Sequence, residues 1–316
     1  MANVFNKVER MVNTTLALLE RDSVLAPLTW LNAAGDFRGA KNDTISIRLP
    51  AYAKANTRAL RSGTARAVTT LHERKVDVTL DTDIYQRVKI TDEELTLDIE
   101  NFERQVVVPV AGSLARGIED AVVTEVSAAT YQNSVVLSAA DPYPAIVKAR
   151  RHLNDSRVPQ DGRVIVVGSE IEEVLLKSDQ FIKADQSGST AAFREAQIGR
   201  VAGFPVITVP SLAPDEAYAF HRTAFVTSSR APFVPASAAA GAVASAGGFA
   251  IRIVQILEPD TVVDNLHADV WVGTNHVTDF GTIDADGRFE PGIDPANPTS
   301  DEDDYFVRAV KITLGS

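Results

Sequence analysis

An α+β fold is predicted for this chain of 316 residues, and three features of the sequence lead to that prediction. Two short segments alternate apolar and polar residues with the period of a half-buried strand. A long segment that begins at residue 91 repeats apolar residues at almost every fourth position, as one face of a helix does. Residues from about 140 to 235 then interchange helical and strand patterns within one region.

The N-terminal part begins with a short amphipathic helix over residues 3–20, followed by an extended segment with the sequence VLAPLTWLN. Two alternating segments come next, TISIRL from residue 44 and VDVTLD from residue 76, and they are expected to pair as a long hairpin. The polar, basic chain between them is too long for an ordinary connection within a domain. It is therefore a candidate projecting loop.

The long helix is expected to begin at Thr91, because Thr91 and Glu94 have the spacing of a capping box. Its apolar pattern continues to about Thr130, and Pro109 lies inside that pattern. Proline has no amide hydrogen and crowds the preceding turn of a helix. A kink or a break is therefore expected at Pro109.

The C-terminal part is expected to contain helices at AIVKARRHLND and SEIEEVLLKSDQFI, with Ser169 as the N-cap of the second helix. Strands are expected at GRVIVVGS, VAGFPVITVP, YAFHRTAFVTS, FAIRIVQIL, HADVWVGT and FVRAVKITL. The Ala, Gly and Ser residues from 236 to 248 predict a flexible connection. Residues 284–304 predict an acidic loop rich in proline and glycine.

Composition excludes several classes of protein. The chain is 45% hydrophobic and 23% charged, which is ordinary for a globular protein. It has no cysteine, so it can form no disulfide, cysteine metal site or thiolate nucleophile. Neither the N-terminus nor the small-residue run is apolar enough for a signal peptide or a membrane span, and a soluble protein is expected. The net charge of −11 argues against a protein that binds nucleic acid by neutralising phosphates.

The distribution of charge is more informative than its sum. Between residues 54 and 75 one acid, Glu73, stands among six basic residues. Between residues 258 and 304 thirteen acids stand with Arg288 as the one Lys or Arg. Two interpretations remain open: the segments are separately solvated, or copies of the chain dock basic loop to acidic surface. The basic residues proposed for such contacts are Lys54, Arg58, Arg61, Arg66 and Arg74.

No catalytic or cofactor motif is present. Ser169 follows a predicted strand but lacks the second glycine of a nucleophile elbow, so it is interpreted as a helix cap. The five histidines (His72, His152, His221, His267 and His276) do not have metal-ligand spacing. DADG at 284–287 fails as a calcium loop, because Thr282 and Ile293 would occupy the acidic positions. Phosphate-binding glycine loops are absent from the sequence. No metal, no cofactor and no enzymatic activity are expected.

The order of elements resembles that of the major capsid proteins of tailed bacteriophages. The resemblance is carried by ITDEELTLDIENFERQVVVPVA at the long helix and covers about residues 40–275. It is closer for the coat-protein branch typified by phage P twenty-two, through LNDSRVPQDGRVIVVGSEIEEVLLKSDQFIKAD, IGRVAGFPVITVPSL and AYAFHRTAFVTSSRAP. The resemblance implies the Hong Kong ninety-seven capsid fold.

That resemblance implies a domain organisation. Residues 1–40 would form an N-terminal arm, 41–90 the hairpin called the E-loop, and 91–139 a peripheral domain with the long spine helix. Residues 140–246 would form the axial domain, and 247–316 the rest of the peripheral sheet with the C-terminal strand. The branch's large inserted domain has no room in this chain, the acidic segment 284–304 has no counterpart, and a cross-link cannot be assigned.

The implied function is that of a structural capsid subunit that self-assembles into hexamers and pentamers of an icosahedral phage head around double-stranded DNA. The implied partners are identical subunits, a separate scaffolding protein, a portal and DNA contacted without sequence specificity, with no membrane. The protein would be part of the virion and would assemble in the host cytoplasm. The alternatives are an α+β hydrolase-type enzyme with a non-contiguous active site and a small-ligand-binding module.

Overall fold

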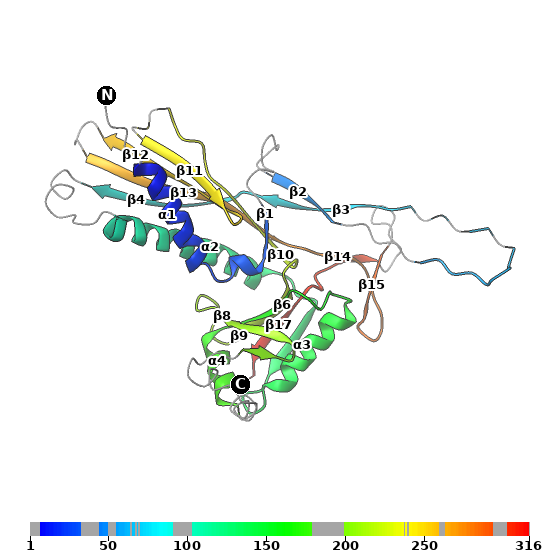
Figure 1. Ribbon diagram of the computed structural model, residues 1–316. Coiled ribbons are helices and arrows are strands. Elements are labelled where there is room, and N and C mark those ends of the chain that lie inside the picture. Colours follow the sequence, from blue (N-terminus) through cyan, green and yellow to red (C-terminus); the bar gives the residue numbers. More distant parts are fainter. Residues whose placement is uncertain are drawn as a thin grey trace. The chain divides into compact units, whose positions relative to one another are not determined.

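The computed structural model describes residues 7–32, 44–49, 55–63, 65, 66, 68, 70–90, 103–178, 199–236, 238, 240–258, 263–292 and 302–315 (Figure 1). The chain forms two compact units, each assembled from three separate segments. The first unit contains residues 1–45, 78–128 and 225–275, and the second contains residues 46–77, 129–224 and 276–316. The predicted α+β class is confirmed, because helices and strands are mixed in both units.

The first unit is built on one mixed sheet in which five strands follow the order β1-β10-β13-β12-β11 and β4 also pairs with β13. The strands are β1 (Trp30–Asn32), β4 (Thr82–Ile90), β10 (Phe225–Arg230), β11 (Ala240–Ala246), β12 (Phe249–Glu258) and β13 (Val263–His276). β1 pairs parallel to β10, with Trp30 opposite Val226, whereas β12 and β4 pair antiparallel to β13. The N-terminal segment is therefore part of this sheet.

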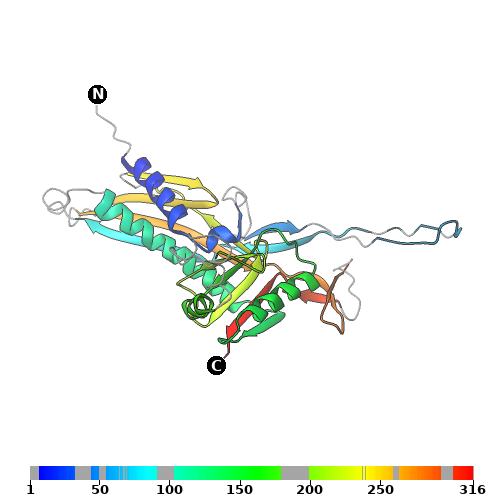
Figure 2. The same ribbon diagram turned by 60° about the horizontal axis from the view of Figure 1, so that its bottom comes forward.

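Two helices cover one face of that sheet, α1 (Lys7–Asp22) and α2 (Val108–Ala128) (Figure 2). α1 contacts β11 and β12, and α2 contacts β4 and α1. Along β13 the side chains of Ala268, Val270 and Val272 are buried, while Trp271 between them is partly exposed. This alternation places the apolar side chains of the strand on one face, under the helices, while the other face carries the polar Asn265, His267 and Asp269, of which Asn265 and Asp269 are also buried.

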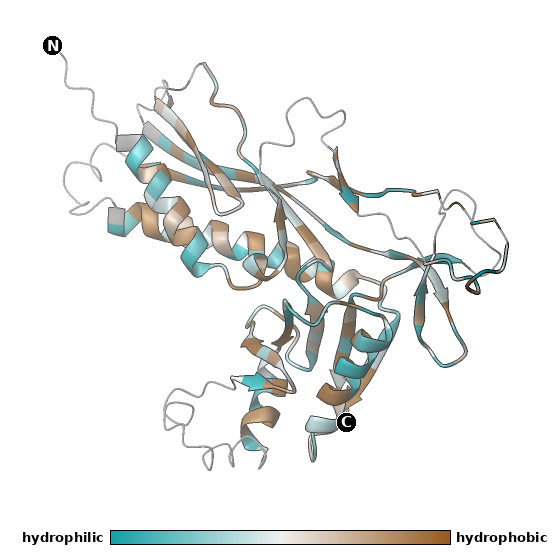
Figure 3. Cartoon of the chain, turned by 45° about the vertical axis from the view of Figure 1, so that its right-hand side comes forward, coloured by the Kyte–Doolittle hydropathy of each residue, from teal (hydrophilic) through white to brown (hydrophobic). Residues whose placement is uncertain are grey.

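The second unit contains a six-stranded sheet with the order β5-β17-β9-β6-β8-β7. Its strands are β5 (Asn133–Leu137), β6 (Arg163–Val167), β7 (Arg200–Val201), β8 (Phe204–Thr208), β9 (Glu216–His221) and β17 (Ala309–Leu314). Helices α3 (Tyr143–Asp155) and α4 (Ser169–Lys177) share one apolar core with these strands, which includes Ile146, Leu153, Val167 and Leu175. Hydrophobic and hydrophilic residues follow each other along these helices, as expected for helices with one face in the core (Figure 3).

Two smaller sheets complete the described chain. β2 (Thr44–Leu49) and β3 (Arg74–Thr79) pair with each other, as predicted from their alternating pattern. β14 (Asp279–Ile283) lies between β15 (Phe289–Pro291) and β16 (Asp303–Tyr305) in a three-stranded sheet of the second unit. We call this the small sheet. The predicted acidic loop 284–304 was therefore partly wrong, because β15 lies within it and β16 begins within it.

The predicted break at Pro109 takes the form of a π-helical turn, η5 (Glu103–Val107), directly before α2. Pro109 is the second residue of α2, where a backbone N–H has no partner within the helix and its loss costs little. The proposed helix start at Thr91 lies outside the described residues. The helix ends at Ala128, close to the predicted end.

Four expectations about the C-terminal part were wrong. Residues 240–246 form β11, paired along its length with β12, instead of a flexible connection. The segment YAFHRTAFVTS forms two strands, β9 and β10, which belong to different sheets. The final strand β17 pairs parallel to β5 and antiparallel to β9, not with the strands that follow residue 247. Ser169 makes no capping hydrogen bond: Gly168 is the N-cap, and the carbonyl of Pro214 accepts the N–H groups of Glu170 and Ile171.

A buried carboxylate connects the N-terminal segment to α2 in the first unit. Glu119 of α2 is 9% exposed, and its Oε1 accepts hydrogen bonds from the backbone N–H groups of Val24 and Leu25, at 2.8 Å from the latter nitrogen. Burial raises the pKa of Glu119, although these backbone hydrogen bonds oppose the rise. The turn after α1 therefore depends on one side chain for its amide partners.

We expect Glu119→Ala to lower the free energy of unfolding of the first unit by about 2–4 kcal/mol, because the buried N–H group of Leu25 and the part-buried one of Val24 lose their acceptor. Glu119→Gln keeps one acceptor oxygen and should cost less. Fluorescence in a denaturant titration measures this unit, because both tryptophans, Trp30 and Trp271, lie in it.

The raised pKa of Glu119 also gives a pH test. A carboxyl group whose pKa is raised by folding contributes stability below its ordinary pKa, and that contribution is lost as the pH rises through the folded value. As the pH rises from the ordinary pKa of Glu119 to the raised pKa of the folded state, the free energy of unfolding of wild type should therefore fall relative to that of Glu119→Gln. Equal pH dependence of the two proteins would contradict the buried position of the carboxylate.

Candidate subunit interface

The chain between β2 and β3 is the most exposed part of the described protein. Residues 55–63, 65, 66, 68 and 70–73 form neither helix nor strand. Three large apolar side chains there lie in water: Leu60 is 91% exposed, Val68 95% and Leu71 61%. Side chains of this kind, close together on one loop, are typical of a surface that a partner covers. We call residues 50–73 the basic loop.

The structure separates the five basic residues that the sequence grouped. Arg58, Arg61 and Arg66 are exposed on the basic loop, in keeping with a role in contacts to another molecule. Lys54 lies outside the described residues. Arg74 differs from the other four, because it is the first residue of β3 and its side chain is only 20% exposed.

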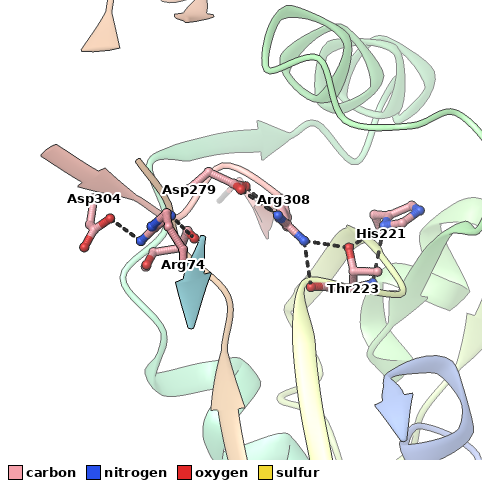
Figure 4. Close-up of polar contacts among 7 residues, drawn as sticks. Arg74, His221, Thr223, Asp279, Asp304 and Arg308 are labelled. Carbon is pink, nitrogen blue, oxygen red and sulfur yellow. Dashed lines mark hydrogen bonds and ion pairs between the residues drawn. The ribbon is translucent and has the colours of Figure 1, made fainter. Parts of the chain in front are cut away.

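Arg74 binds two groups of its own chain. Its Nη2 forms an ion pair with Asp304 of β16, and its Nη1 donates to the carbonyl of Thr278, directly before β14, at 2.9 Å (Figure 4). Both partners belong to the small sheet or border it. The hypothesis that Arg74 contacts a second subunit therefore finds no support, because this guanidinium is engaged within one chain.

Each strand of the small sheet carries one acid that pairs with an arginine from another element of the second unit. Arg74 pairs with Asp304 of β16, Arg157 beyond α3 pairs with Glu290 of β15, and Arg308 before β17 pairs with Asp279 of β14. The last pair is bidentate, with both nitrogen–oxygen distances 2.6 Å. A two-pronged guanidinium–carboxylate pair fixes orientation as well as distance.

A series of hydrogen bonds leads from Arg308, which pairs with Asp279, through Thr223 to the buried His221 (Figure 4). Its Nη1 donates to Thr223 Oγ1 at 3.0 Å, and Thr223 Oγ1 lies 2.8 Å from His221 Nδ1. The backbone N–H of Thr223 also donates to His221 Nδ1, at 3.3 Å, so Nδ1 acts as an acceptor. Burial is the largest cause of the lowered pKa of His221, and the positive charge of Arg308 lowers that pKa further. The neutral imidazole is the form that this arrangement stabilises.

The remaining acids of the small sheet face water. Asp284, Asp286 and Asp303 are exposed. Asp284 also closes the turn between β14 and β15, because its Oδ1 accepts the backbone N–H groups of Asp286 and Arg288 at 3.0 and 2.7 Å. Gly287 has a φ of 77° in this turn, which a residue with a side chain rarely adopts. The DADG motif is therefore a structural turn.

The described residues contain no cluster of three His, Asp or Glu side chains that could hold a metal ion. Ser169, the one nucleophile considered from the sequence, is the first residue of α4. Among the described helices none is long and apolar enough to cross a membrane. What sequence reasoning missed is the pairing of Arg157, Arg308 and Arg74 with acids that lie far along the chain, for which no local pattern exists.

The stability of the second unit should fall on acidification because of His221. A histidine whose pKa is lowered by folding contributes stability above its ordinary pKa of about 6.5, and that contribution is lost as the pH falls from this value through the lower pKa of the folded state. The protection factors for amide exchange in β9 and β17, measured from pH 7.5 to 5, should fall more in wild type than in His221→Gln. His152 adds an effect of the same sign, so the comparison between the two proteins isolates His221.

The fold and the sequence were compared with known proteins. A protein-family model described as phage capsid protein matches residues 75–299. A search of curated proteins gives no match. Among solved structures, a chain from Mycobacterium phage Che8 matches with a TM-score of 0.60 and 19% identity over 92% of this chain and 90% of that one.

Two further structures match at lower identity. The capsid of cyanophage P-SCSP1u gives a TM-score of 0.61 and 11% identity over 93% of this chain and 88% of that one. The capsid of an empty GTA particle gives a TM-score of 0.56 and 12% identity over 93% of this chain and 90% of that one. These likenesses confirm the Hong Kong ninety-seven-like α+β capsid fold. Since the family model covers more than half of its length, the chain belongs to the phage capsid protein family.

Proposed function

We propose that this protein is the major, shell-forming subunit of a tailed-phage head, and that its copies assemble as hexamers and pentamers of an icosahedral capsid around double-stranded DNA. The observation that carries this proposal is the basic loop of a capsid-fold chain, which leaves Leu60, Val68 and Leu71 in water. The capsids among the structural neighbours support assembly of many copies into a shell. Assembly in the host cytoplasm, with a separate scaffolding protein and a portal, belongs to the same proposal.

The apolar and the charged residues of the basic loop are expected to contribute differently to binding of a neighbouring subunit. Burying a Leu or Val side chain stabilises an interface by roughly 1.5–3 kcal/mol. An exposed ion pair contributes about 0–1 kcal/mol and is screened by salt. We infer that Leu60, Val68 and Leu71 supply most of the affinity for a neighbouring subunit, while Arg58, Arg61 and Arg66 steer the approach. Contacts of this strength stay reversible enough for misplaced subunits to leave.

The exposed acids Asp284, Asp286 and Asp303 have the charge that complements those arginines. Copies of one chain that meet in this way would use the basic loop of one subunit and the small sheet of the next. Any contact with packaged DNA would be weak and non-specific, because the chain carries a net charge of −11.

Electron microscopy of the purified chain at increasing concentration tests the proposed function. We expect closed shells, tubes or rings, because the apolar side chains of the loop are buried only in an assembly. Adding a co-expressed scaffolding protein should shift the products toward closed shells. A discrete monomer or dimer under all these conditions would contradict the proposal.

Reversing the charge of the basic loop should slow assembly. Each of Arg58→Glu, Arg61→Glu and Arg66→Glu should lower the initial assembly rate, measured by light scattering, by about tenfold at low salt and by much less at 0.5 M salt. Arg151→Glu, an equal charge change at an exposed position of α3, is the matched control. Circular dichroism should show unchanged folding, and normal assembly rates for all three variants would refute the role of the loop.

A further inference from the structure

The three arginine bridges connect the small sheet to three elements that lie far apart in the sequence. Arg157 follows α3, Arg308 precedes β17, and Arg74 begins β3 at the end of the basic loop. The first two elements belong to the six-stranded α/β part of the second unit. The third carries the basic loop. The small sheet therefore connects the packed α/β part to the strand at which the exposed basic loop ends.

The small sheet can act as one rigid piece. Phe280 and Phe289 are 8% and 4% exposed, and the rings of Phe289 and Tyr305 lie 6.4 Å apart. A Cβ atom at Gly281 would lie only 2.2 Å from the carbonyl oxygen of Glu290, so β14 and β15 approach more closely there than a side chain permits. Residues of β14 pair with β15 on one side and with β16 on the other.

Its attachment to the α/β part fixes orientation. Arg308 contacts Asp279 with two nitrogens and also donates to Thr223, in the turn after β9. Arg157 forms an ion pair with Glu290 of β15, the strand next to β14 at one edge of the small sheet. Two separate bridges on two different strands resist rotation of the small sheet, which one bridge alone would allow.

Arg74 then transmits this orientation to the loop. Its guanidinium donates to Asp304 on one nitrogen and to the carbonyl of Thr278 on another, so its plane is fixed by two acceptors on different segments (Figure 4). A lysine has no planar fork and could not hold both groups in this way. Because Arg74 is the first residue of β3, the side chain acts at the point where the loop ends and the strand begins.

We propose that the small sheet is a brace that sets the direction of the basic loop, and that Arg74 is the positioning residue through which it does so. This explains why the sequence places an acidic segment far from the basic loop and yet in the same unit. Its effect on assembly rests on the proposed function, in which the loop contacts a neighbouring subunit. The orientation of the loop itself does not.

Small changes at the root of the loop have large effects at its tip. Each arm of the loop holds about a dozen residues, which is at most about 40 Å of extended chain. A tilt of about 10° at the root would then move the tip by roughly 7 Å, more than the width of a side chain. An ion pair with modest energy can therefore decide whether Leu60 and Val68 reach a neighbour.

A distance measurement in the unassembled full chain tests the brace directly. The protein has no cysteine of its own, so Ala65→Cys and Ala285→Cys provide two unique positions for spin labels, both exposed. We expect Arg74→Glu and Asp304→Arg each to broaden the distance distribution between the labels by at least about twofold. Amide exchange in β3 should rise by about threefold to tenfold in the same variants, as loss of a partly buried ion pair predicts.

The exchanged pair Arg74→Glu with Asp304→Arg is the decisive variant. It should restore more than half of the lost order, although not all, because a carboxylate at position 74 cannot donate to the carbonyl of Thr278. Lys75→Glu makes the same charge change at the neighbouring, exposed position of β3 and should leave the distribution as in wild type. If the change of charge alone caused the broadening, Lys75→Glu would broaden the distance distribution as much as Arg74→Glu does.

The outcomes separate the brace from the function of the protein. An unchanged distribution in Arg74→Glu overturns the brace even if wild type forms normal shells. A broadened distribution with normal shells overturns the inference that loop direction controls assembly. A broadened distribution together with open or irregular particles, both reversed by the exchanged pair, supports it. Failure of wild type to assemble would count against the proposed function, while the distance measurement would still decide the brace.

Discussion

The exposure of the basic loop is the constraint on which the rest of the structure depends. Leu60, Val68 and Leu71 lie in water on a segment without helix or strand, where the single chain gains nothing from their apolar surface. In the proposed function, a neighbouring subunit covers this surface. The two packed units, by contrast, bury their own apolar side chains within the chain.

Charged residues are used in two ways in the second unit. Asp279, Glu290 and Asp304 are paired with arginines of their own chain, although the side chain of Asp304 is still 54% exposed. Asp284, Asp286 and Asp303 are exposed and take part in none of these three pairs. The paired acids order the small sheet, and the exposed acids remain available to a partner. The same segment can thus contribute to the fold of one chain and to contacts between chains, without either use competing with the other.

Buried ionisable groups oppose each other in their response to pH. Glu119 in the first unit has a raised pKa and His221 in the second has a lowered one, and burial is the leading cause of both shifts. Both groups therefore favour their neutral forms in the folded protein. Through Glu119, low pH stabilises the folded state of the first unit, and through His221 it destabilises the folded state of the second. The two units are therefore expected to differ in how their stability depends on pH, even though they belong to one chain.

Local patterns in the sequence determined the secondary structure at many positions. The alternating residues of β2 and β3, the helical spacing of α2 and α3, and Pro109 at the start of α2 were predictable, because each depends on neighbours along the chain. The order of these elements was also enough to indicate the capsid fold. The exposed Arg58, Arg61 and Arg66 were identified from charge alone, and their contact with a second subunit stays a prediction.

Tertiary structure alone decided which strands share a sheet and which charges meet. β10 and β17 each pair with strands far away in sequence, because sheets are assembled by burial of their faces and not by proximity along the chain. Arg74 looked like the other basic residues of its segment, yet Asp304 lies 230 positions away. An ion pair between distant residues leaves no periodic signal, so only the fold could place Arg74 within its own chain.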